Sequence, residues 1–88
     1  MELNLRRPLA FIDIETTGTN VSSDRIVEIS ILKIHPNRKE EWISLRINPE
    51  MPIPQSSTSI HGITDADVAD APVFREVAKK LSAFLEGC

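Results

Sequence analysis

The sequence predicts an α/β domain in which three strands precede an irregular segment and a C-terminal helix. Two runs rich in apolar and β-branched residues lie at 8–15 and 25–34, and an alternating run follows at 40–47. A helical spacing of apolar residues then fills most of 72–87. The 88 residues are 41% apolar and 26% charged, a composition that excludes a disordered chain and is sufficient for one small domain.

The first strand is expected at residues 8–15. Both of its faces are apolar until Asp13, which is typical of a strand buried in the interior of a sheet. Residues 16–20 supply hydroxyl side chains and a glycine, so the strand ends in a turn.

The second and third strands are expected to form an antiparallel hairpin, because only residues 35–39 separate them. In the third strand, Ile43, Leu45 and Ile47 alternate with polar or aromatic residues, which indicates a half-exposed edge strand. Trp42 is expected to pack at this edge, and His35 to lie exposed in the turn without a functional role.

The rest of the chain is expected to be helical after an extended, proline-rich segment at 48–55. A short helix is predicted at 56–61, and the spacing of Thr64 and Asp67 predicts a capping box that opens one or two further turns. The last helix is expected to hold Pro72 in its first turn and to end near Gly87.

Charge and cysteine usage limit the class of protein. Ten basic and thirteen acidic residues give a net charge of −3, which argues against binding nucleic acid by bulk charge but not through bound divalent cations. The single cysteine, Cys88, excludes an internal disulfide framework and indicates a reducing compartment such as the cytoplasm. No apolar run approaches the roughly 20 residues that span a bilayer, and the N-terminus lacks the apolar core of a secretory signal.

Asp13 and Glu15 are the strongest candidates for a functional site. Two residues apart on a strand, they point from the same face with side-chain origins about 6–7 Å apart. Neighbouring carboxylates repel each other unless a cation compensates them, and Mg²⁺ or Mn²⁺ does so well. On spacing alone, a metal site and two solvated acidic residues are equally compatible with this pattern. The hydroxyl and glycine residues that follow add donors where a phosphate could bind.

The run Phe11-Ile12-Asp13-Ile14-Glu15-Thr16-Thr17-Gly18-Thr19 resembles the first motif of the DEDD superfamily of 3′–5′ exonucleases. The resemblance is to the proofreading subunit or domain of bacterial DNA polymerase III, with ribonuclease T as a relative. Further matches follow in the order that the family shows: Arg25-Ile26-Val27-Glu28-Ile29, Asn48-Pro49 and Ile60-His61-Gly62-Ile63-Thr64.

This resemblance implies a ribonuclease-H-like fold and metal-dependent removal of nucleotides from the 3′ ends of DNA or RNA, in association with a DNA polymerase. Two Mg²⁺ or Mn²⁺ ions would activate water and stabilise the departing oxygen. Asp13 and Glu15 would be the metal-binding catalytic residues. Thr16 would lie against the terminal nucleotide, and His61 would contact its sugar or phosphate.

The resemblance also implies that residues 1–88 form the N-terminal half of an exonuclease domain. The motifs that supply the other two carboxylates and the general base have no counterpart in the sequence, and Ser56 stands where the family has a glutamate. A truncated fold of three mainly antiparallel strands and a C-terminal helix is therefore expected, with little or no nuclease activity. The first strand would then be an apolar sheet edge, which predicts a homo-oligomer that covers it.

Two alternatives stay open at this point. The chain could be a non-catalytic remnant that acts as a binding or assembly module. A haloacid-dehalogenase-like phosphatase, with Asp13 as nucleophile, is disfavoured because Glu15 stands where that family has an aspartate and because a hairpin rather than a helix follows.

Overall fold

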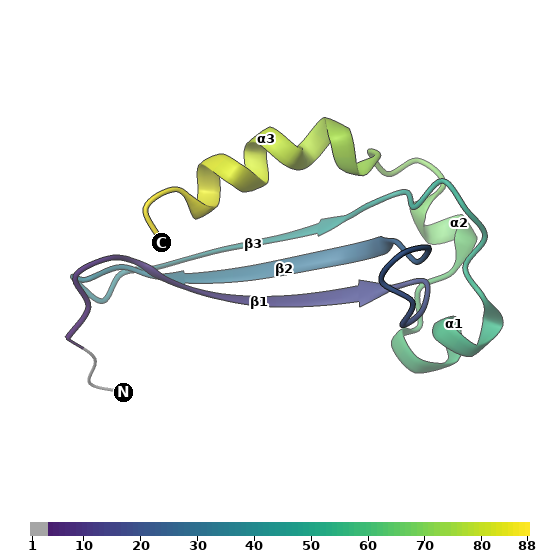
Figure 1. Ribbon diagram of the computed structural model, residues 1–88, viewed down its shortest axis with the longest axis horizontal. Helices are drawn as coiled ribbons and strands as arrows, with labels where there is room; N and C mark the ends of the chain where they lie inside the picture. Colours follow the sequence, from purple (N-terminus) through teal and green to yellow (C-terminus); the bar gives the residue numbers. More distant parts are fainter. Residues whose placement is uncertain (1–3) are drawn as a thin grey trace.

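A computed structural model describes residues 4–88 as a three-stranded sheet with three helices (Figure 1). The strands are β1 (Leu9–Thr16), β2 (Ile26–Ile34) and β3 (Glu40–Arg46), antiparallel in the order β1-β2-β3. The helices are α1 (Gln55–His61), α2 (Asp65–Val68) and α3 (Phe74–Leu85). These elements confirm the predicted α/β class, the β2–β3 hairpin and the order of strands before helices.

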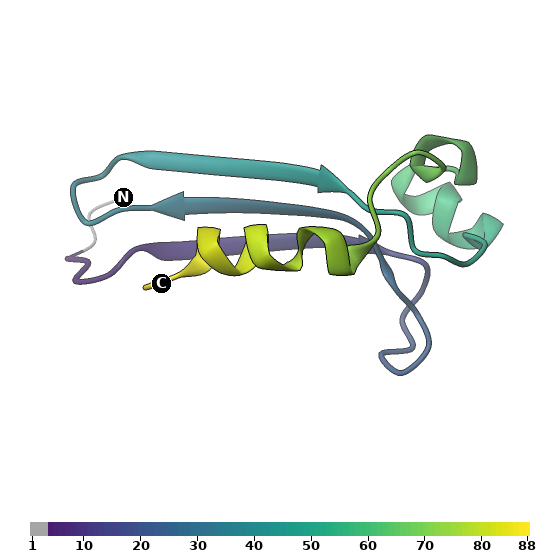
Figure 2. The same ribbon diagram turned by 90° about the horizontal axis from the view of Figure 1, so that it is seen from above.

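Helix α3 runs along one face of the sheet, whereas α1 and α2 lie together at one end of it (Figures 1 and 2). Within residues 4–88, no helix covers the opposite sheet face, which we call the open face. No helix in this part of the chain is long and apolar enough to cross a membrane.

The strand register gives the open face three rows of side chains. The pairings align one apolar row, one row of an aspartate with two serines, and one charged row. These rows are Phe11, Leu32 and Trp42; Asp13, Ser30 and Ser44; and Glu15, Glu28 and Arg46. Ser30 Oγ and Ser44 Oγ lie 2.9 Å apart and form a hydrogen bond. The carboxylates therefore lie on the face away from α3.

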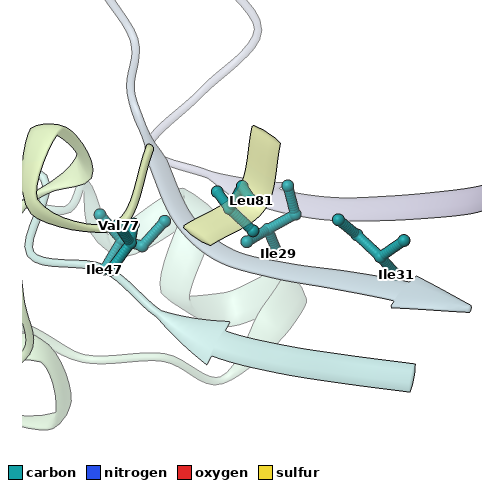
Figure 3. Close-up of a cluster of buried hydrophobic side chains, with 5 residues drawn as sticks. All are labelled: Ile29, Ile31, Ile47, Val77 and Leu81. Carbon is teal, nitrogen blue, oxygen red and sulfur yellow. The ribbon is translucent and has the colours of Figure 1, made fainter. Parts of the chain in front are cut away.

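The main core lies between α3 and the sheet. It is formed by Ile29, Ile31, Ile47, Val77 and Leu81 (Figure 3). Figure 3 shows Val77 of α3 against Ile47 and Leu81 against Ile29. The spacing of these two helical residues is the predicted amphipathic period, so α3 forms because it can bury this stripe. Lys33 of β2 holds the C-terminal end of α3 to the sheet, since its Nζ donates to Phe84 O at 2.8 Å.

A second, smaller core joins α2 and the segments on either side of α1 to the sheet. Val27 is fully buried and packs with Ile53, Ile63 and Val68. The β1–β2 register shifts here, from Glu15 opposite Glu28 to Thr16 opposite Ile26. Val27 is thus the extra residue of a β-bulge that lies beside the predicted first motif.

β1 is an edge strand within the described residues, as the truncated fold implied, and Ile12 is 54% exposed because only β2 flanks it. Three other local expectations are wrong, each for a physical reason. Trp42 is 72% exposed because its side chain lies on the open face. His35 is half-buried and its Nε2 lies 2.6 Å from Glu41 Oε1. Pro72 precedes α3 because Val73 is extended and forms a bridge to Asn48, whose N–H donates to Pro72 O at 2.9 Å.

The predicted capping box at the start of α2 is present. Asp67 N donates to Thr64 Oγ1 at 3.2 Å, and Thr64 N donates to Asp67 Oδ2 at 2.9 Å. The bonds from the Thr64 main chain and side chain, with a smaller contribution from Arg46, hold the pKa of Asp67 below its ordinary value.

We expect the capping box to stabilise the fold in a pH-dependent way. Because the folded-state pKa of Asp67 is lowered, its contribution is present above the ordinary aspartate pKa of about 4 and is lost as the pH falls below it. The thermal midpoint of the wild type should therefore exceed that of Asp67→Asn at neutral pH, and the gap should close in acid. A gap that stays constant across this range would contradict the assignment.

Candidate functional site

Asp13 and Glu15 lie near the C-terminal end of β1, on the open face, as the strand period predicts. Asp13 is exposed and stands opposite Ser30, whereas Glu15 is half-buried and stands opposite Glu28. The two carboxylates therefore share one side of the sheet, with a third carboxylate in the adjacent strand.

The loop after β1 is held by its own side chains. Thr16 Oγ1 donates to Gly18 O at 2.6 Å, which closes a tight turn directly after Glu15. Thr17 is 1% exposed, and its Oγ1 donates to Asp24 Oδ1 at 2.8 Å and accepts from Arg25 N at 3.0 Å. The hydroxyl residues that looked like phosphate donors thus form the internal frame of the loop.

Helix α1 brings His61 to the same loop, 45 residues from Thr16 in the sequence. His61 Nε2 lies 3.0 Å from Thr16 O, and His61 Nδ1 accepts from Ile63 N at 3.0 Å. Since Nδ1 is an acceptor, the geometry assigns the ring proton to Nε2, which donates to Thr16 O. A second contact from α1 supports this one, because Ser57 Oγ donates to Thr17 O at 2.7 Å.

A pocket of about 210 Å³ opens between the end of β1 and α1. It contains three of the four predicted site residues, namely Glu15, Thr16 and His61, and Asp13 lies outside its lining. Its other walls are Ile14, Gly18, Thr19, Ser57 and Ile60. Ile60 is 85% exposed, so it offers an apolar surface at the rim.

The sequence arguments did not assign Ile60, Ser57 or Asp24 to the site. Ile60 precedes His61 and could have been noticed as an apolar residue in an otherwise polar short helix. For Ser57 and Asp24 the sequence holds no signal, because their contacts to Thr17 depend on how the loop and α1 pack.

The donor set at the end of β1 fits a hard divalent cation. Mg²⁺ in proteins is usually held by one or two carboxylates and completes its octahedron with water or substrate phosphates. Asp13 and Glu15 supply such a pair from one strand face. Among residues 4–88, no three histidine, cysteine, aspartate or glutamate side chains come together as a fuller ligand group.

Comparisons with known proteins agree with this geometry. A family model described as exonuclease matches residues 10–88. The DNA polymerase III subunit epsilon-like protein of Rhodobacter capsulatus is 42% identical over 78 residues, which cover 85% of this chain and 11% of that protein.

Two solved structures show the same fold. Exonuclease X, in complex with 5′ overhanging duplex DNA, superposes with a TM-score of 0.70 and 33% identity, covering 82% of this chain and 42% of that one. The nuclease domain of 3′hExo, a DEDDh family member bound to rAMP, gives a TM-score of 0.74 at 23% identity, covering 91% and 44%. The chain thus spans less than half of each of these proteins, and its truncated ribonuclease-H-like α/β fold is that of their nuclease domains. Because the family model covers nearly all of the sequence and its first motif lies on β1, the chain belongs to the exonuclease family of the DEDD superfamily.

Proposed function

We propose that the chain supplies the first part of a metal-dependent 3′–5′ exonuclease site, which binds the terminal nucleotide of a single-stranded 3′ end of DNA or RNA. The observation that carries this proposal is the bond from His61 of α1 to Thr16 O. This bond joins α1 to the end of β1, the strand that carries Asp13 and Glu15. Residues of α1 and of β1 therefore line one pocket.

Asp13 and Glu15 would hold Mg²⁺ or Mn²⁺. When bound, such ions activate a water molecule and stabilise the departing 3′-oxygen of a phosphodiester. The protein's own contribution is to fix two carboxylates on one strand face, next to a pocket for the nucleotide. A bound cation would offset the repulsion between a polyanionic substrate and these carboxylates, in a chain whose net charge is −3.

The pocket walls suggest a role for each neighbouring side chain. Ile60 and Ile14 present apolar surface suited to the flat face of a nucleobase. His61 donates from Nε2 at the pocket wall, so a small shift would let it contact the sugar or phosphate of the nucleotide. Neither nitrogen is free to act as a general base in this arrangement.

We propose that residues 1–88 act as the first portion of an exonuclease domain and release few or no nucleotides alone. This proposal is supported by the small number of candidate metal ligands in residues 4–88. Two carboxylates without a positioned base bind metal weakly and do not activate water efficiently. The names of the relatives favour a DNA polymerase as partner and replication as the setting. The single exposed Cys88 is compatible with the reducing cytoplasm.

A non-catalytic assembly module is the second candidate, and the open face favours it. Phe11 and Trp42 are 46% and 72% exposed in the apolar row, and β1 has one strand neighbour among residues 4–88. An apolar edge strand of this kind invites pairing with another strand, and a second copy of the chain would provide one. Sedimentation of a monomer at high concentration would contradict this candidate.

Titration with Mn²⁺, in the presence and absence of a nucleoside 5′-monophosphate, tests the exonuclease proposal. We expect saturable, calorimetrically measurable binding that falls below detection in Asp13→Ala, because the weak two-carboxylate site then loses one of its two protein ligands. Asp70→Ala removes an exposed aspartate elsewhere and should bind as the wild type does. Absence of wild-type binding at millimolar Mn²⁺ would overturn the proposal and favour the assembly module.

A further inference from the structure

We propose that Asp24 is a positioning residue, which holds the loop after β1 in the conformation that places Glu15 and Thr16 at the nucleotide pocket. The inference rests on the proposed function and adds to it a residue outside the pocket lining. Asp24 is half-buried in the segment before β2, and it acts through Thr17 and Gly18 rather than on a ligand.

The Asp24 carboxylate accepts one hydrogen bond on each oxygen. Oδ1 accepts from Thr17 Oγ1 at 2.8 Å, and Oδ2 accepts from Asn20 N at 2.9 Å. The main chain of Asp24 adds a third bond, since its N–H donates to Asn20 O at 2.8 Å. The carboxylate thus joins both ends of the connection between β1 and β2.

Thr17 connects the Asp24 carboxylate to Arg25 and to α1. Its hydroxyl accepts from Arg25 N at 3.0 Å, and its N–H donates to Arg25 O at 2.9 Å. Its carbonyl accepts from Ser57 Oγ of α1 at 2.7 Å. Because Thr17 is 1% exposed, water cannot replace a lost carboxylate partner, and the other acceptor within reach of its hydroxyl is the weak thioether Met51 Sδ at 3.6 Å.

Gly18 provides the space that the carboxylate occupies. A Cβ at this position would lie 2.5 Å from Asp24 Oδ2 and 2.8 Å from Asp24 Cγ. The close approach fixes the loop by shape as well as by hydrogen bonds. Thr16 lies between this fixed segment and Glu15, and its carbonyl receives the His61 bond, so movement of the loop would displace both pocket walls.

The test compares Asp24→Asn with Asp70→Asn, an exposed aspartate of matched chemistry. With its oxygen kept on Asn20 N, the amide introduced by Asp24→Asn would have to donate to Thr17 Oγ1. The Thr17 hydroxyl proton would then turn to the weaker acceptor Met51 Sδ, 3.6 Å away. The charge-assisted bond from Thr17 to the carboxylate is thus lost without a change in size. We expect hydrogen exchange at the amides of Asn20 and Arg25 to accelerate about tenfold, the equivalent of one hydrogen bond. Affinity for Mn²⁺ with a nucleoside 5′-monophosphate should weaken by a similar factor, whereas Asp70→Asn should change neither quantity.

Thr17→Val and Thr17→Ser provide a second, independent pair in case Asp24→Asn does not fold. Valine removes the hydroxyl and should reproduce the effect on exchange and affinity, whereas serine keeps the hydroxyl and should retain both. Ile31→Val serves as a control for stability alone, because it weakens the distant main core and should lower the melting midpoint without changing affinity.

The two readouts separate the possible failures. If Asp24→Asn and Thr17→Val lower the melting midpoint but leave exchange at Asn20 and Arg25 and the affinity unchanged, the positioning role is wrong. If the wild type binds no metal or nucleotide, the proposed function fails, and the exchange rates alone then decide whether Asp24 holds the loop.

Discussion

Replacement of Ile31 with alanine should destabilise the fold more than any other single truncation in the sheet. Ile31 is 1% exposed on the central strand, beneath α3, and belongs to the main core (Figure 3). Loss of a fully buried isoleucine side chain costs about 2–5 kcal/mol, against a total stability of about 5–15 kcal/mol for a small domain. We expect a large fall in the urea midpoint, with the slope of the transition unchanged.

Ile12 provides a control that is matched in residue type, sheet face and row. It pairs directly with Ile31 across β1 and β2, yet it is 54% exposed. Ile12→Ala should therefore cost about 1 kcal/mol or less, mainly from strand propensity and partial burial. Equal losses for the two variants would show that β1 is covered in solution, since Ile12 would then be as buried as its neighbour.

The replacement of Gly18 with alanine should produce the largest effect at the candidate site. The new Cβ would meet the Asp24 carboxylate at 2.5–3.0 Å, so the carboxylate has to leave its place. Thr17, which is buried, then loses the acceptor of its hydroxyl, at a cost of about 1–3 kcal/mol. We expect lower stability in thermal unfolding and loss of nucleotide binding in calorimetry.

A double-mutant cycle identifies the cause. If the clash with Asp24 is responsible, Gly18→Ala should cost much less stability in an Asp24→Ala background than in the wild type. If the losses of stability from Gly18→Ala and Asp24→Ala simply add in the double variant, the alanine side chain does not displace the Asp24 carboxylate. The proposed clash at Gly18 is then wrong.

Much of the fold follows from local pattern. The alternation at Ile43 and Leu45, the period of Val77 and Leu81 and the capping box at Thr64 each depend on neighbours within one element. These patterns predict the structure correctly because the apolar faces that they define are the faces that pack in the folded protein. The shared side of Asp13 and Glu15 is of the same kind, since it follows from the strand period alone.

The expectations that failed depend on what lies beside an element rather than on its own sequence. The apolar run of β1 by itself indicates an interior strand, because burial depends on a second neighbour that the run does not reveal. The edge position that β1 has among residues 4–88 was expected only from the resemblance to a longer domain. Trp42 is exposed for a similar reason, because its partners Phe11 and Leu32 form one open row. The contact between Asp24 and Gly18 is a loop geometry, which no periodic pattern predicts.

The strand that carries the candidate metal ligands, β1, is also one of the two edge strands of the sheet within the described part of the chain. Charged side chains on an edge strand discourage pairing with a like strand, so Asp13 and Glu15 oppose the pairing with a second copy that the apolar residues of β1 favour. A cation bound between them would cancel the charge that performs this task. Binding of a cation at Asp13 and Glu15 would therefore make β1 more prone to pair with another strand. A neighbouring strand that covers β1 would remove this opposition between metal binding and protection against association.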